Sequence, residues 1–179
     1  MGLPLERLTL PEYLAWENEQ AERHEFYAGE VFAMVGARRV HGLVGLNLAA
    51  ALKTHLKGTR CRVFVESMKL QAADDKLFYP DVFVSCDESD LKTEMIFRHP
   101  TLVAEVLSEG TQAFDRGRKF AAYRGIASLR ETVLIDPDSR EVSVYRRNER
   151  GNFELIDQTG AGQIELDSLQ FALPMAELF

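Results

Sequence analysis

Two acidic residues stand where buried strands are expected. Asp81 follows a proline and precedes the apolar run Val82-Phe83-Val84, and Glu105 lies inside a second run from Leu102 to Leu107. Such runs are typical of strands, and the second is typical of a central strand covered on both faces. An ionised carboxylate in a buried strand is costly unless it is paired or binds a cation. Together, the two acids indicate a metal site.

The chemistry expected of this pair is phosphodiester hydrolysis. Mg²⁺ suits a site with few carboxylates because it keeps waters and binds substrate phosphates, and Mn²⁺ is an alternative ion. The metal can supply a bound hydroxide and stabilise the departing oxygen, while a nearby lysine positions water and offsets charge on phosphorus. No P-loop or dinucleotide fingerprint is present, so no organic cofactor is expected.

Composition sets the broad class of protein. The 179 residues suffice for one domain with a real core, and we assign residues 1–179 to a single domain. The net charge of -7 argues against a globally basic surface that binds nucleic acid, although a local basic groove is compatible with it. Cys61 and Cys86 lack metal-type or redox spacing, so reduced thiols are expected. Without a membrane-length apolar stretch or a signal sequence, we expect a soluble cytoplasmic protein with no membrane partner.

The elements that must position the acids begin with a helix and a hairpin. Thr9 is suited to cap the first helix, with Glu12 in the capping-box position. Residues 24–34 predict a hairpin that turns at Ala28-Gly29. A long helix follows over about residues 40–57.

The rest of the chain is rich in strands. Strands are predicted over residues 61–70, 77–85, 102–107 and 131–136, a helix over 115–123, and a tail hairpin pairing 142–145 with 153–156. This order predicts an α/β protein of the α+β type, with a mixed β-sheet core, an N-terminal helix and hairpin, and a β-rich C-terminal tail. The two longer helices are expected to cover the sheet.

Several segments carry a resemblance to a known family. They are Glu25 to Glu30, His41, Tyr79-Pro80-Asp81-Val82, Val103 to Ser108, Asp115 to Tyr123 and Val133 to Asp136. The order of Pro-Asp and then Glu-Val-Leu resembles the PD-(D/E)XK nuclease superfamily. More closely, the chain resembles the Uma2 (DUF820) family over about Thr9 to Tyr145. The resemblance implies a restriction-endonuclease-like fold, cleavage of DNA, and a homodimer, since such nucleases often cut two strands as dimers.

The resemblance leaves two residue assignments open. The superfamily lysine stands two residues after the second acid, where this chain has Leu107. The resemblance suggests a lysine relocated to the following helix, with Lys119 as the candidate and Lys69 as its rival. It also makes either Glu25 or Glu30 a third acid.

Each candidate also has a plainer interpretation. Asp81 alone could cap a turn, and Lys119 could be a hydrated lysine in a basic cluster with Arg116 and Arg118. Glu25 or Glu30 could be an exposed hairpin carboxylate. His41 could line the cleft, but a histidine at a helix start is more often structural. A hydrolase triad with Ser108 is rejected, because the chain has no Gly-x-Ser-x-Gly elbow.

The leading hypothesis is a Mg²⁺-dependent endonuclease acting on DNA. Asp81 and Glu105 would hold the metal, and Lys119 would orient water or stabilise the transition state. The alternative is a catalytically inactive nuclease fold that serves as a binding or assembly module, which the displaced lysine and the net charge both motivate. Action on RNA or a smaller phosphoester ranks lower, because no aromatic platform for stacking bases can be assigned.

Overall fold

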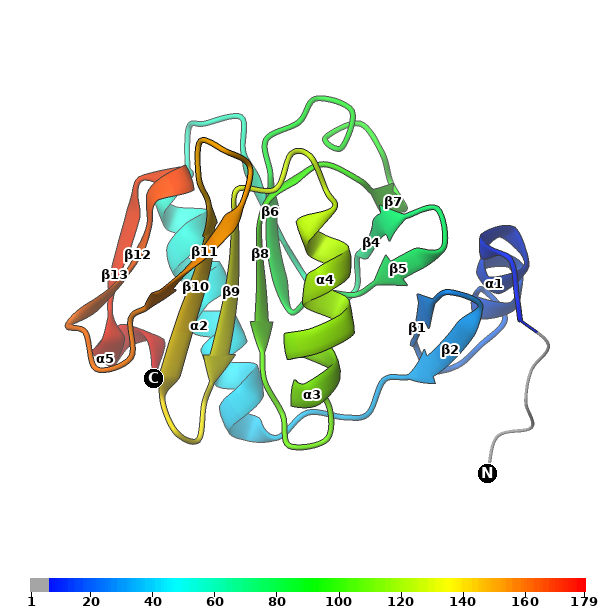
Figure 1. The fold of residues 1–179 in the computed structure, drawn as a ribbon, viewed down its shortest axis with the longest axis horizontal. Coiled ribbons are helices and arrows are strands. Elements are labelled where there is room, and N and C mark those ends of the chain that lie inside the picture. Colours follow the sequence, from blue (N-terminus) through cyan, green and yellow to red (C-terminus); the bar gives the residue numbers. More distant parts are fainter. Residues whose placement is uncertain (1–6) are drawn as a thin grey trace.

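A central six-stranded sheet organises the molecule (Figure 1). The computed structural model describes residues 7–179. Residues 1–6 of the predicted domain lie outside this range. In spatial order the sheet contains β11 (Phe153–Asp157), β10 (Glu141–Arg147), β9 (Glu131–Asp136), β8 (Pro100–Val106), β6 (Val82–Ser85) and β3 (Arg62–Val65). β8 and β9 are parallel, and the other neighbouring pairs are antiparallel.

Two smaller sheets and several helices complete the fold. The five-stranded sheet contains, in order, β2 (Glu30–Ala33), β1 (His24–Tyr27), β5 (Lys76–Phe78), β4 (Lys69–Ala73) and β7 (Ile96–Phe97), and β12 (Gln163–Leu166) pairs with β13 (Phe171–Pro174). The helices are α1 (Leu10–Glu17), α2 (Arg39–His55), α3 (Gln112–Phe114), the π-helical turn η1 (Asp115–Lys119), α4 (Phe120–Arg124), the 3₁₀ turn η2 (Asp167–Leu169) and α5 (Met175–Leu178). Within residues 7–179, no helix combines the length and the apolar character needed to cross a membrane.

The N-terminal elements form as their sequence predicts. The Thr9 side chain accepts a hydrogen bond from the backbone N–H of Glu12, whose carboxylate in turn accepts from the N–H of Thr9. The β1–β2 hairpin turns at Ala28 and Gly29, which have φ values of +50° and +89°. A Cβ at residue 29 would also lie only 2.9 Å from the Cβ of Arg7, so glycine is needed there for space as well as conformation.

Two predicted strands were wrong because each is divided between two sheets. The segment predicted as one strand over residues 77–85 forms β5 and β6, which belong to different sheets. Pro80 has no N–H to donate to a ladder, so the strand is interrupted there. The segment 61–70 divides in the same way into β3 and β4, with Glu66 at φ +30° between them. Asp81 therefore lies at a junction between sheets.

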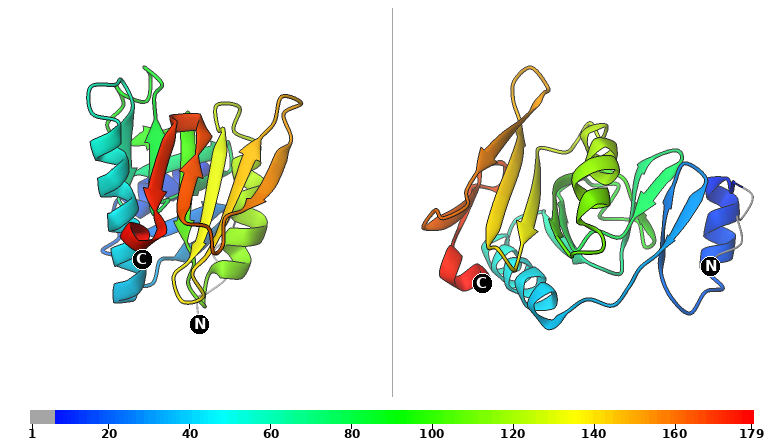
Figure 2. Two further views of the ribbon diagram at one scale, coloured as in Figure 1. Left: turned by 90° about the vertical axis from the view of Figure 1, so that its left-hand side faces the viewer. Right: turned by 60° about the horizontal axis from the view of Figure 1, so that its bottom comes forward.

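The central sheet is covered on both faces, as predicted. Leu102, Ala104 and Val106 of β8 pack into the core beneath α2, whereas Val103 packs into the core beneath α4. Figures 1 and 2 show these two helices on opposite sides of the sheet. Because side chains alternate along a strand, Glu105 points to the same face as Val103, toward the segment containing α3, η1 and α4.

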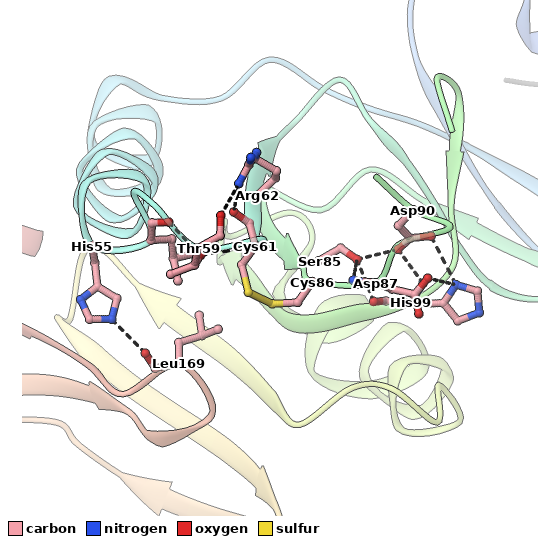
Figure 3. Close-up of a disulfide and its surroundings, with 11 residues drawn as sticks. His55, Thr59, Cys61, Arg62, Ser85, Cys86, Asp87, Asp90, His99 and Leu169 are labelled. Carbon is pink, nitrogen blue, oxygen red and sulfur yellow. Dashed lines mark hydrogen bonds and ion pairs between the residues drawn. A yellow bond between two sulfur atoms is a disulfide. The ribbon is translucent and has the colours of Figure 1, made fainter. Parts of the chain in front are cut away.

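The two cysteines form a disulfide, so the expectation of reduced thiols was wrong (Figure 3). Cys61 precedes β3 and Cys86 follows β6, whose register pairs Arg62 with Ser85. The two cysteines therefore face each other across antiparallel neighbours, with their Cα atoms 4.0 Å apart. The bond links the edge strand β3 to β6, the strand that begins directly after Asp81.

Candidate active site

Asp81 and Glu105 face each other across neighbouring strands. The β6–β8 register pairs Val82 with Ala104, and one further step in that register places Asp81 opposite Glu105. The backbone N–H of Val106 donates to Oδ2 of Asp81 at 2.7 Å. The two acids singled out in the sequence therefore share one end of the sheet, and both line the same cleft.

Lys119 contacts the carboxylates directly. Its Nζ lies 2.7 Å from Oε1 of Glu25, 3.0 Å from Oε1 of Glu105 and 3.6 Å from Oδ1 of Asp115. Only 4% of Lys119 is exposed. The rival Lys69 instead holds its ammonium over the ring of Tyr79, 5.6 Å from the centroid. Of the two lysines, Lys119 is the one that meets the acids.

A π-helical turn gives Lys119 its position. The N–H of Phe120 bonds to the carbonyl of Asp115, five residues earlier, which widens the helix locally. Asp115 and Lys119 are both buried, while Arg116 and Arg118 are exposed. The basic residues beside Lys119 are thus hydrated as the plainer interpretation expected, but Lys119 is not. Single π turns are frequent at functional sites.

Of the two candidate third acids, the site contains Glu25. Its Oε1 accepts from the backbone N–H of Tyr79 at 3.0 Å as well as from Lys119. Glu30 is exposed at the start of β2, where it pairs with Tyr27. Glu25 therefore connects the five-stranded sheet to the carboxylates of the central sheet.

Two further residues of the site were not singled out in the sequence. The hydroxyl of Tyr123 donates to Oε1 of Glu105 at 2.5 Å, and the hydroxyl of Thr111 donates to Oδ2 of Asp115 at 2.7 Å. Asp115, Lys119 and Tyr123 follow one another at intervals of four residues, which places them on one face of the helical segment. That four-residue spacing was the signal in the sequence that could have assigned Tyr123 to the site.

His41 lines the same cleft from the first turn of α2. Its Nε2 lies 3.4 Å from Oδ2 of Asp81. Its Nδ1 is buried and has no hydrogen-bond partner among residues 7–179. The contact with Asp81 raises the pKa of His41, and burial opposes this increase.

The electrostatics of the site are dominated by crowded, buried carboxyl groups. Burial raises the pKa of Glu105 well above its ordinary value, and the attraction of Lys119 opposes that increase only in part. Burial would lower the pKa of Lys119, but Glu105, Glu25 and Asp115 raise it well above its ordinary value. Burial likewise raises the pKa of Asp115. Three carboxyl groups contact one ammonium group, and Asp81 lies near Glu105, so the acidic groups outnumber the cation. This excess favours binding of a further cation.

The carboxylates border a cleft of about 960 Å³. It is lined by the acidic cluster with Lys119 and by the segment that joins β2 to α2. Met34, Val35 and Arg38 of this segment line the cleft, together with Phe32 of β2. The cleft gives a substrate access to the acids, and its mixed lining suits a ligand with both charged and apolar parts.

The acidic pair offers ligand atoms suited to Mg²⁺ or Mn²⁺. Among residues 7–179, neither Oδ1 of Asp81 nor Oε2 of Glu105 takes part in a side-chain hydrogen bond, whereas their other oxygens do. Two carboxylate oxygens with waters and a substrate phosphate match the preference of Mg²⁺ for few protein ligands. A different group in this range has three potential ligand atoms within 4.8 Å of one another. It consists of Asp87, Asp90 and His99 (Figure 3).

The chain is similar to known proteins over most of its length. A family model named Uma2 and described as "Putative restriction endonuclease" matches residues 10–176. Two proteins of Synechocystis sp., named as uncharacterized proteins slr1290 and sll1609, are 34% and 36% identical to it. The alignments cover 93% and 78% of this chain, and 88% and 81% of the relatives.

A solved structure has the same fold. It is the crystal structure of a "putative nuclease belonging to DUF820" from Anabaena variabilis, with a TM-score of 0.79 at 21% identity. The similarity covers 96% of this chain and 97% of the other. The predicted fold, a mixed β-sheet core flanked by helices, is thereby confirmed. The match to the family model and the identity to relatives lead to one conclusion: the chain belongs to the Uma2 family.

Proposed function

We propose that this protein is a nuclease that hydrolyses DNA phosphodiester bonds with Mg²⁺, or with Mn²⁺ in its place. The observation that carries the proposal is the contact of Lys119 with Glu105, because it supplies the third functional group that the strand lacks at Leu107. The family description as a restriction endonuclease and the description of the Anabaena protein as a nuclease support it.

Asp81 and Glu105 fit a metal through the oxygens that their neighbours leave free. When bound there, Mg²⁺ would supply Lewis-acid stabilisation of the negative charge that develops on the phosphodiester. Val106 and Tyr123 fix the orientation of the two carboxylates, since each donates to one oxygen of its partner. A preorganised pair of this kind needs little rearrangement when the charge develops.

Lys119 would orient the attacking water and stabilise charge on the phosphorus oxygens. Its ammonium is held by Glu25 at 2.7 Å and by Glu105 at 3.0 Å, so it stays protonated beside the metal ligands. Glu25 is the positioning residue for Lys119 in this scheme, and Glu30 has no part in it. The presence of the lysine favours the active enzyme over the inactive binding or assembly module.

Cleavage of both strands by a homodimer stays a prediction. Cutting a duplex requires one cut in each strand, so two copies of the site would serve a duplex best. Sedimentation of the protein with and without a DNA duplex would test this prediction, with a single copy in both states contradicting it.

Plasmid cleavage tests the proposal. The wild-type protein, with Mg²⁺ or Mn²⁺, should nick or linearise supercoiled DNA, and the chelator EDTA should stop the reaction. Asp81→Ala and Glu105→Ala should be inactive, whereas Glu30→Ala, at an exposed position, should cleave as the wild type does. Cleavage that survives both substitutions in the acidic pair would refute the assignment. A folded wild type that gives no calorimetric heat with either metal would favour the inactive module.

A further inference from the structure

We propose that His41 is a positioning residue that holds Asp81 by one oxygen and so directs the other oxygen into the cleft. The inference rests on the proposed function, since the oxygen in the cleft would be the metal ligand. It concerns a residue to which neither the family description nor the names of the relatives give a role.

Two nitrogen atoms converge on the same oxygen of Asp81, one in a hydrogen bond and one at ion-pair distance. The N–H of Val106 lies 2.7 Å from Oδ2, and Nε2 of His41 lies 3.4 Å from it. Val106 belongs to the neighbouring strand β8 and His41 to the first turn of α2, so the carboxylate is held from two elements. With Oδ2 engaged on both sides, Oδ1 is the atom left to face the cleft.

The surroundings of the two ring nitrogens of His41 indicate which of them carries the proton. Nδ1 is buried and without a partner among residues 7–179, so a proton there would leave a buried donor unsatisfied. The carboxylate of Asp81 can only accept, so a proton on Nε2 is the one that can be directed at a partner, and Nδ1 is then left as an unpaired acceptor rather than an unpaired donor. In that tautomer the Nε2–H is the group that faces Asp81.

The surroundings of His41 do not suit a histidine that merely fills the core. Its side chain lines the cleft beside Asp81 rather than the apolar core under α2. Carboxylates that bind metals are commonly held by neighbouring polar groups, and these partners orient the ligand.

Nitrogen NMR of the metal-free protein tests the tautomer without any reference to activity. At a pH high enough for the imidazole to be neutral, the His41 ring should carry its single proton on Nε2. The His41→Asn variant identifies the signal among the four histidines. A ring protonated on Nδ1 overturns the inference, because Nε2 then has no proton to donate.

Manganese calorimetry on matched variants tests the consequence for the metal. The amide of glutamine reaches as far as imidazole Nε2, whereas that of asparagine reaches only as far as Nδ1. His41→Asn should weaken Mn²⁺ binding by about 10- to 100-fold, and His41→Gln should recover most of the loss. His55→Gln is the control and should bind as the wild type does, because His55 contacts the carbonyl of Leu169 away from the cleft. Equal affinities in folded His41→Asn and wild type overturn the inference. If the folded wild type binds no Mn²⁺, the proposed function fails and the tautomer alone decides whether His41 holds Asp81.

Discussion

Nζ of Lys119 lies 3.0 Å from Oε1 of Glu105, although the two residues are fourteen positions apart and belong to different elements. The strand that carries Glu105 ends at Val106, and Leu107 follows it at the position where the PD-(D/E)XK pattern has lysine. The helix after the strand turns back over the same face of the sheet and returns a lysine to this point. A lysine ammonium therefore lies beside the second acid, although it is supplied by a helix and not by the strand.

Loss of the Lys119 ammonium should abolish most of the cleavage. We expect Lys119→Met to lower the rate by about 10²- to 10³-fold, because one group that stabilises the developing charge is removed. Lys69→Met is the matched control and should cleave as the wild type does, since Lys69 contacts Tyr79 rather than the acids. A plasmid assay under identical metal conditions measures both rates. Equal losses in the two variants would contradict the assignment of Lys119.

Glu25 and Glu30 should differ in their effect on stability. Glu25→Ala leaves the N–H of Tyr79 without its buried partner and removes from Lys119 the nearest of its three carboxylates. Breaking a buried pair on one side is strongly destabilising, so the free energy of unfolding should fall by about 3 kcal/mol. Glu30→Ala changes an exposed side chain and should stay within about 0.5 kcal/mol of wild type. Urea denaturation measures both, and similar losses would show that Glu25 is not part of the buried network.

Asp115 should make stability decrease as the pH rises. Burial raises its pKa in the folded protein above the unfolded value of about 3.9. Between these two pKa values the folded state binds more protons than the unfolded state, so this contribution is fully present below about pH 3.9 and is lost as the pH rises through the folded-state pKa.

The substitution Asp115→Asn isolates this contribution. The asparagine side chain does not titrate and can still accept the hydrogen bond from Thr111. Relative to wild type, the variant should therefore gain free energy of unfolding with increasing pH, by at most about 1.4 kcal/mol per pH unit. The exposed turn variant Asp74→Asn is the control and should show no such trend. A relative stability of Asp115→Asn that decreases with pH would contradict the predicted sign.

Reduction of the Cys61–Cys86 disulfide should destabilise the fold without removing the site. The bond closes a loop with a sequence separation of 25 residues, for which a loss of about 3 kcal/mol is typical. The double variant Cys61→Ser, Cys86→Ser should show the same loss and still cleave DNA, because neither cysteine lines the cleft. Alkylation that labels both thiols of the native protein under non-reducing conditions would contradict the bond.

Local signals in the sequence predicted much of the fold. The Thr9 cap and the Ala28-Gly29 turn are set by residues within a few positions of each other, and both form as expected. The pairing of Asp81 with Glu105 could also be anticipated, because each stands in an apolar run and neighbouring strands bring such residues together. The cap and the turn depend on short-range chemistry that a sequence displays directly.

Features that depend on long-range register escaped prediction. The apolar run across Pro80 does not reveal that its halves join different sheets, since both halves have strand-like composition. The facing of Cys61 and Cys86 follows only once β3 and β6 are aligned. Glu25 and Glu30 both flank one turn, and only the docking of the hairpin against β5 buries the first. The π turn that positions Lys119 is formed by residue types that an α-helix also accepts.

Diffraction from crystals soaked in Mn²⁺, with the anomalous signal used to locate the ion, tests most directly whether the acids at the sheet junction hold a metal. We expect an anomalous peak in the cleft within coordination distance of Oδ1 of Asp81 and Oε2 of Glu105, and no such peak in crystals of Asp81→Ala. A peak confined to Asp87, Asp90 and His99, or none beside the acidic pair at saturating Mn²⁺, would contradict the proposed site.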